Sequence, residues 1–195
     1  GRTVIQADPS LEGRDKREFP YFIEPMRTRK PFIQDIYHSD VEQKAAMAFA
    51  APVFCLEHDG EHIIGVIVMR NNLEQSLYPL LQNRTGAGET GETLIVNKDG
   101  VTLNELRWVE DAPLKLKISA EPAVRGAAGE TGIIEGLDYR GERVLAAYTH
   151  IPLTQWGFVA KRDLAEVYAP IHAMRRNLLL VLGTTALVVI FVSLL

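Results

Sequence analysis

Hydrophobic positions in the first half of the chain fall into three short stretches that predict strands. PFIQDIYHSD (31–40) alternates apolar and polar residues, as a strand with one buried face does. AAMAFAAPVFCLE (45–57) is a longer apolar stretch with an expected bend at Pro52, and HIIGVIVMR (62–70) is typical of a strand covered on both faces. The Asp-Gly turn at 58–61 between the last two predicts an antiparallel hairpin.

Helical signals in this half are weaker. REFPYFIEPMRTRK (17–30) contains Pro20 and Pro25, so any helix there is short and irregular. NNLEQSLYPLLQNR (71–84) places its leucines at helical spacing and predicts a helix. We therefore expect residues 1–84 to form one module of strands packed on helices.

The second half predicts a sheet built from hairpins, over residues 85–162. Its expected elements are a first hairpin from ETLIVN (92–97) and VTLNEL (101–106), an extended piece LKLKIS (114–119), a helical turn EPAVRGAAG (121–129), a hairpin at 132–152 and a last strand WGFVAKRD (156–163). Together with the first half, this pattern indicates an α+β fold of two modules with antiparallel sheets flanked by helices.

The C-terminal pattern is different, because it loses its charges. Asp163 and Glu166 form a predicted capping box that starts a juxtamembrane helix over 163–177, interrupted or kinked at Pro170. Residues 178–195 carry no charge and as a helix would span roughly 27 Å, close to the hydrocarbon thickness of a bilayer. We expect a transmembrane helix there, in contact with membrane lipid.

Composition narrows the range of functions. Apolar residues make up 47% of the chain, charged residues 24%, and the net charge of −4 comes from interspersed acids and bases. No basic patch suggests a nucleic-acid partner. The single cysteine, Cys55, cannot form an internal disulfide, and its apolar neighbours favour a buried strand residue over a nucleophile.

The stretch Gly86–Gly91 spells GAGETG, a literal GxGxxG motif. A dinucleotide site requires a strand before this motif and a helix starting on its last glycine. Here the predicted order is helix and then strand, and no Gly-Lys-Ser/Thr follows. We therefore expect a hinge between two modules that binds no nucleotide.

Other candidate chemistry is sparse. His58 and His62 flank a hairpin turn, where a solvated turn is favoured over a metal site. Asn83-Arg84-Thr85 matches a glycosylation sequon, although matches of this length are common by chance. No nucleophile elbow or zinc-hydrolase motif is present, so we expect no catalytic residue, cofactor or metal in this segment.

At the level of whole segments, the chain resembles the double Cache (dCache) sensor domains. Residues 13–77, with their D…R…YF stretch, I-x-D-x-Y-x-S strand, AAPVF strand and G-x-x-x-GV return strand, resemble the later part of the membrane-distal module. GETGETLIVNKDGVTLNE and DYRGERVLAAYTHIPLTQWGFVAKRDLAEVYAPI resemble the membrane-proximal module. The resemblance implies PAS-like modules outside the cytoplasmic membrane of a bacterium, with a first transmembrane helix and a long N-terminal helix upstream.

The resemblance also implies a ligand site in the distal module. Amino-acid-binding members carry Arg-x-Trp-Tyr and then Tyr-x-Asp; aligned on Asp35, this chain has Phe19 at the arginine, Tyr21 at the tryptophan and Phe22 at the tyrosine. Ile33 replaces the second tyrosine, so only the aspartate is kept. Loss of the arginine, which binds the ligand carboxylate, argues against amino-acid sensing.

Four residues are nevertheless candidates for the pocket. They are Arg17, which is near enough in sequence to replace the missing arginine, and Tyr21, Asp35 and Tyr37. The alternative at equal weight is that Tyr21 and Phe22 are core residues and that Asp35 fixes a loop.

We expect a sensory input region of a dimeric membrane receptor, with a small-molecule ligand and a sensor histidine kinase as output. A chemoreceptor or a diguanylate cyclase is the alternative output. An alternative of another class is a membrane-anchored cytoplasmic enzyme, because Arg175 and Arg176 lie on the globular side of the span and the positive-inside rule would place that side in the cytoplasm.

Overall fold

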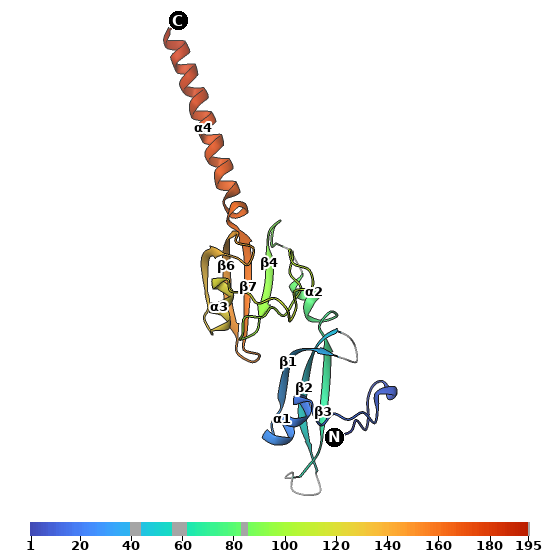
Figure 1. Cartoon of the computed structure of the whole chain (residues 1–195). Coiled ribbons are helices and arrows are strands. Elements are labelled where there is room, and N and C mark those ends of the chain that lie inside the picture. The colour runs from blue at the N-terminus through green and yellow to red at the C-terminus, as the bar shows by residue number, and fades with distance from the viewer. Residues whose placement is uncertain (40–43, 56–61, 83–85, 195) are drawn as a thin grey trace. The chain divides into compact units, whose positions relative to one another are not determined.

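The structure is a computed structural model that describes residues 1–39, 44–55, 62–82 and 86–194 (Figure 1). The chain divides into two compact units, Gly1–Leu81 and Gln82–Leu195. Both contain an antiparallel sheet with helices, so the predicted α+β class is confirmed.

The first unit contains a three-stranded sheet in the order β1-β2-β3, formed by Phe32–Ser39, Lys44–Phe54 and Ile63–Asn72. Helix α1 (Pro20–Thr28) packs on this sheet. Its first residue is Pro20, whose fixed φ suits that position, and it ends at Arg29 in the left-handed conformation (φ 59°). Pro25 lies inside the short helix without ending it.

Two expectations for this unit are wrong. β3 is not covered on both faces, because α1 packs on one side of the sheet while Ile64, Ile67 and Met69 are each more than 60% exposed. The predicted helix over 71–84 shrinks to α2 (Leu77–Leu81), because β3 continues to Asn72 and a turn follows. Leu73 is fully buried in that turn, which explains the leucine spacing without a helix.

The second unit contains a four-stranded sheet in the order β4-β7-β6-β5, all antiparallel. Its strands are β4 (Glu92–Val96), β5 (Gly132–Leu137), β6 (Arg143–Ile151) and β7 (Trp156–Asp163). The predicted hairpin at 132–152 and the last strand are therefore confirmed.

Helix α3 (Glu121–Ala127) covers β6 and β7 at very close range. A Cβ on Gly157 would lie 2.5 Å from the backbone nitrogen of Ala127, and one on Gly126 would lie 3.2 Å from the carbonyl oxygen of Thr149. Two glycines facing each other thus let the backbones of helix and sheet approach. The core beneath consists of Leu94, Val96, Leu106, Ala112, Ile118, Ala123, Val144, Ala146, Tyr148 and Val159.

Between β4 and α3 the expected strands are wrong. In this segment only isolated bridges form, Val96 with Thr102 and Val101 with Lys117. The segment instead buries Asn104, whose side chain accepts a hydrogen bond from the backbone of Ile95 at 2.7 Å. A side chain that satisfies strand backbone groups takes the place of a regular hairpin.

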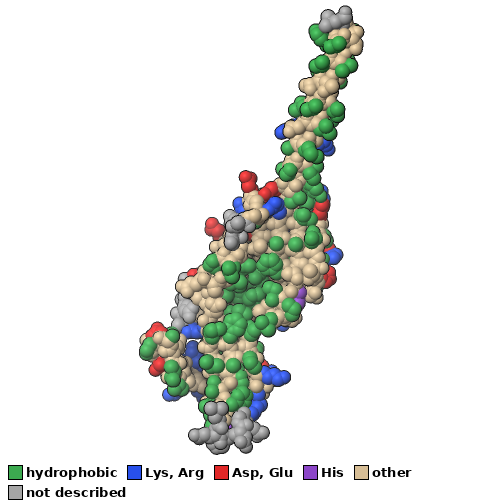
Figure 2. All heavy atoms as spheres, turned by 180° about the vertical axis from the view of Figure 1, so that it is seen from behind, with side chains coloured by type: hydrophobic (Ala, Val, Ile, Leu, Met, Phe, Trp, Pro, Cys, Tyr) green, Lys and Arg blue, Asp and Glu red, His purple; other side chains and the backbone are tan. Residues whose placement is uncertain are grey.

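Helix α4 runs from Leu164 to Leu194 without interruption, so an interruption at Pro170, one of the two predicted outcomes, does not occur. It is long and apolar enough to cross a membrane, its apolar window is unburied, and Figure 2 shows hydrophobic side chains along it. The expectation for 178–195 agrees with this over the residues described.

Candidate functional site

Two of the four predicted pocket residues meet in the first unit. Tyr21, on α1, is 4% exposed, and its ring lies 6.4 Å from that of Tyr37 on β1 and 5.0 Å from that of Phe19. These rings pack with Ala48 and Ala50 of β2, which are almost fully buried. We call Phe19, Tyr21 and Tyr37 the aromatic cluster.

Two cations that sequence reasoning missed lie beside the aromatic cluster. The Lys16 ammonium lies 4.9 Å from the centre of the Phe19 ring, and burial together with the charge of Arg70 lowers its pKa. Burial raises the pKa of Tyr21 to about 12, against the opposing effect of Arg70. Arg70 pairs in register with Ala48, so the strand period places it on the side of the sheet where Ala48 packs against Tyr21.

Asp35 occupies an irregular point of β1. The register with β2 shifts between Gln34 and Tyr37, which makes this a β-bulge, and the Asp35 carboxylate is exposed and accepts the backbone N–H of Ile36 at 2.7 Å. Bulges turn side chains out of the regular alternation and are frequent beside functional sites.

Arg17 lies apart from the aromatic cluster. Its guanidinium is paired with Asp15 at 2.5 Å, and its side chain is 71% exposed. A role for Arg17 in the pocket stays a prediction.

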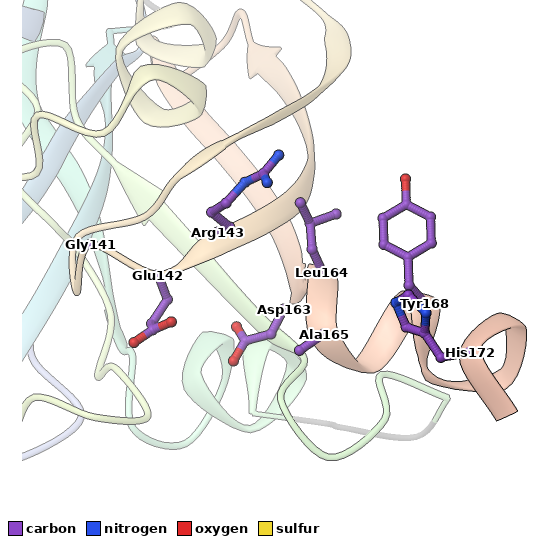
Figure 3. A pocket seen from close by; sticks show the side chains of 8 residues that line it. All are labelled: Gly141, Glu142, Arg143, Asp163, Leu164, Ala165, Tyr168 and His172. Carbon is purple, nitrogen blue, oxygen red and sulfur yellow. The ribbon is translucent and has the colours of Figure 1, made fainter. Parts of the chain in front are cut away.

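In the second unit, an open hollow of about 440 Å³ lies where α4 leaves the sheet. Figure 3 shows Glu142, Arg143 and Asp163 at its sheet side and Tyr168 on α4. Two of its polar groups already have partners: Asp163 binds Arg140 at 2.5 Å, and Tyr168 donates to Glu135 at 2.7 Å. We assign no ligand to it.

The most unusual chemistry of the second unit is a buried ion network. Lys161 of β7, with a side chain 2% exposed, lies 2.8 Å from Glu92 of β4 and also binds Asp138. The Arg140 guanidinium lies 2.7 Å from the Asp138 carboxylate and 2.5 Å from the Asp163 carboxylate, and so links the two. Each of these five side chains thus has an opposite charge beside it, as buried ions require.

Aromatic rings complete the network. The Tyr139 hydroxyl donates to both carboxylate oxygens of Glu92, and the Arg140 guanidinium lies 3.7 Å from the centre of the Trp108 ring. Because its polar groups are satisfied from within, we interpret the network as structural and not as a ligand site.

The Gly86–Gly91 loop has no helix at its end, since β4 begins at Glu92. Its carbonyls bind Arg162, and its amides donate to Glu166. The predicted capping box is therefore wrong: Glu166 serves the loop, and the backbone N–H of Asp163 donates to Thr90 Oγ1.

The remaining candidates of the sequence have little support. His58 and the sequon Asn83-Arg84-Thr85 lie outside the described residues. Within the described part of the chain, no group of three or more His, Cys, Asp or Glu side chains could hold a metal ion. Cys55 is half-buried just after β2, neither fully buried nor in the strand.

Several solved structures are similar to this chain in fold. The ligand-binding domain of Mlp24 with asparagine is 21% identical over 87% of this chain and 63% of that one, with a TM-score of 0.55. The extracellular domain of mmHK1S-Z3, a protein assigned as a histidine kinase, is 19% identical over 80% and 57% of the two chains, with a TM-score of 0.59.

A third similar structure is the ligand-binding domain of the Pseudomonas aeruginosa amino acid chemoreceptor PctB with L-arginine. It is 16% identical over 90% of this chain and 64% of that one, with a TM-score of 0.55. The chain thus spans less than two thirds of each of these structures. A comparison with curated proteins found no match.

The family profile described as "Cache domain" (dCache_1) matches residues 1–171, nearly nine tenths of the chain and both units. This match agrees with the resemblance seen in the strand and turn motifs, and the chain therefore belongs to the Cache domain family.

Proposed function

We propose that the chain is the extracytoplasmic input region of a bacterial membrane receptor, and that its two units are PAS-like modules of which the first binds a small molecule. The observation that carries this proposal is the aromatic cluster of the first unit, with Lys16 and Arg70 beside it, in a Cache domain chain that continues into an apolar helix. The fold also supports it, because similar structures are ligand-binding domains.

The residues of the first unit favour a small zwitterion, such as an amino acid, as ligand. Lys16 and Arg70 supply the positive charge that the sequence lacks at Phe19, and a carboxylate is its natural partner. Asp35, at the bulge of β1, is the predicted partner of a ligand ammonium. Tyr21 and Tyr37 offer aromatic surface for the rest of the molecule.

The binding test uses the chain in lipid nanodiscs and isothermal titration with the twenty L-amino acids, simple carboxylates and simple amines. Asp35→Asn should weaken binding of an amino acid by roughly 1.5–3 kcal/mol if the carboxylate contacts the ligand, and leave carboxylates unaffected. Arg70→Gln should weaken both classes. Asp111→Asn, at an exposed carboxylate of the second unit, is the matched control.

Affinity unchanged in both variants would overturn the assignment of the site. A lower melting temperature without ligand in Asp35→Asn, at unchanged affinity, would identify Asp35 as a structural residue.

For the whole receptor we propose an inner-membrane homodimer, with a histidine kinase as output. A chemoreceptor is the second candidate, favoured by the fold shared with chemoreceptor domains. Topology is tested by inserting a periplasm-active or a cytoplasm-active reporter at the exposed turn at Gly141. Activity from the cytoplasmic reporter alone would show that the globular part lies in the cytoplasm. This is the topology that the positive-inside rule gives for Arg175 and Arg176.

A further inference from the structure

The segment that enters the second unit is bonded directly to the start of α4. The Glu166 carboxylate, in the first turn of that helix, accepts the backbone N–H groups of Glu89 at 2.9 Å and Thr90 at 2.8 Å, and also the Thr90 hydroxyl. The Arg162 guanidinium donates to the carbonyls of Gly86 at 2.7 Å and Ala87 at 2.8 Å. We call the segment Gly86–Thr90 with Arg162 and Glu166 the clasp.

The glycines of the segment are required by this close fit. Gly88 has a φ of +79°, and a Cβ there would lie 2.0 Å from Glu166 Oε1. A Cβ on Gly91 would lie 2.0 Å from the carbonyl oxygen of Ala87. The GAGETG stretch is thus shaped around a carboxylate of its own chain, which occupies the amides that a phosphate would otherwise use.

The negative charge of Glu166 strengthens the hydrogen bonds of the clasp. Hydrogen bonds from Thr90 and Glu89 lower the pKa of Glu166, so its carboxylate is ionised at neutral pH and accepts charge-assisted bonds. The Thr90 hydroxyl also accepts the backbone N–H of Asp163 at 3.1 Å, where β7 passes into α4. Every contact of the clasp therefore joins the incoming segment to the junction of β7 and α4.

The clasp joins two parts of the chain that are far apart in sequence, the segment that follows the first unit and the start of α4. The first unit ends at Leu81, and Gly86 is only five residues further on. Glu166 lies in the first turn of α4, which continues to Leu194. A displacement of the connecting segment thus reaches the helix through a few hydrogen bonds, without passing along the seventy-odd residues of the sheet between them.

We propose that the clasp transmits displacement from the connecting segment to α4, with Glu166 and Arg162 as positioning residues of signal transmission. This inference rests on the proposed sensory function. The competing interpretation is that the clasp only caps the start of α4 and carries no displacement.

The test uses the full chain in nanodiscs and needs no ligand. Glu166→Gln removes the charge and one acceptor oxygen of the clasp, Arg162→Met removes its guanidinium, and Thr90→Val is a milder variant in case either fails to fold. The matched controls are Glu121→Gln and Arg125→Met, which break an exposed ion pair of α3 in the same unit. Tryptophan fluorescence equal to that of the unaltered chain verifies that the second unit is folded in each variant, because both tryptophans lie in that unit.

Two readouts separate transmission from capping. Hydrogen exchange of the Glu89 and Thr90 amides should rise about tenfold or more in the clasp variants. Spin labels at Ile64→Cys and Met174→Cys, in a Cys55→Ser background, report the distance distribution between the first unit and α4; both sites are exposed. We expect this distribution to broaden in the clasp variants and to stay unchanged in the controls.

Faster exchange with an unchanged distribution would show that the clasp is a local cap and would overturn the proposal. Unchanged exchange would overturn it as well, because the clasp would then not hold the segment. Failure of the sensory function would appear elsewhere, as absence of binding in the titrations, and would leave both readouts intact.

Discussion

The two units bury different kinds of side chain. One buried cluster of the first unit contains Tyr21, Ala48 and Ala50, with larger apolar side chains partly covered around it, and other apolar residues are buried elsewhere in the described part of this unit, namely Ile36, Ala46, Met47, Leu73 and Tyr78. The second unit buries a cluster of ten apolar residues, and beside it an ion network centred on Lys161. Regions with little buried apolar surface open at lower free energy than well-packed ones.

This difference suits two tasks. A unit with fewer buried apolar side chains can couple its packing to a ligand, because a ligand shifts an equilibrium by as much as its affinities for the two states differ. A unit with a large core and paired internal charges keeps its shape and can hold the start of a long helix in place. We therefore expect the effects of destabilising substitutions to differ between the two units.

The largest effect is expected for Lys161→Met. It leaves Glu92 and Asp138 buried without their shared cation, which should lower the free energy of unfolding of the second unit by about 3–5 kcal/mol. Urea unfolding followed by tryptophan fluorescence measures it, since Trp108 and Trp156 both lie in this unit. Lys115→Met, at an exposed pair with Asp111, should cost less than about 1 kcal/mol. Equal losses in the two variants would refute a structural role for the network.

A smaller effect is expected for Gly88→Ala. The left-handed backbone alone costs a non-glycine residue about 1–2 kcal/mol, and the clash with Glu166 adds to it. Gly141→Ala is the matched control, with a φ of +82° and open space around it, so it should show the backbone cost alone. The same urea experiment compares them, and equal stability of the two variants would contradict the fit of the loop around Glu166.

Acid should weaken the second unit through Asp138. Burial by itself raises the pKa of this carboxyl, but hydrogen bonds from Lys161 and Arg140 outweigh it and hold the pKa below its ordinary value. The folded state then binds fewer protons than the unfolded chain, so the contribution of Asp138 is complete above pH about 4 and is lost as the pH falls through the folded value. Unfolding free energies measured from pH 6 to pH 3 should show this slope, and Asp138→Asn should flatten it. An unaltered slope in that variant would exclude Asp138 as its source.

The smallest effect concerns the first unit and alkaline pH. Because burial raises the pKa of Tyr21 to about 12, the folded state keeps the phenol proton that the unfolded chain loses near pH 10. Stability from this group is complete below pH about 10 and is lost as the pH rises through 12. Ultraviolet titration of the tyrosines should show a component near pH 12 that Tyr21→Phe removes, while the late titration of Tyr139, whose pKa is raised by burial and by Glu92, stays in place. Persistence of that component would assign it to another buried phenol.

Local patterns in the sequence predicted elements that form between residues close together in the chain. The hairpin over β5 and β6 followed from a turn between two apolar runs. For α1 the prolines indicated only that any helix would be short and irregular, and the structure has a helix of nine residues there. The helix over 71–84 failed because Leu73 is buried in a turn, where leucine spacing carries no helical information. The segment after β4 failed because Asn104 satisfies backbone groups of β4 that a second strand would have used.

The candidate site was predictable only in part. Tyr21 and Tyr37 followed from the family resemblance, and they do lie together. Lys16 and Arg70 are more than fifty residues apart in sequence, and only folding of β3 beside α1 brings them to the same aromatic cluster. The partner of Glu166 was missed for the same reason, since its bonds join residues 76 and 77 positions away.

No residue separates β7, which ends at Asp163, from α4, which begins at Leu164, and this direct junction fixes the angular phase of α4 relative to the sheet of the second unit. Inserting one residue after Ile171 would turn everything downstream by about 100° and advance it by about 1.5 Å. Insertions of about seven residues restore the original orientation, because they add two full turns. Any output domain joined to this chain is therefore in or out of phase with the sheet according to the exact number of residues in the helix.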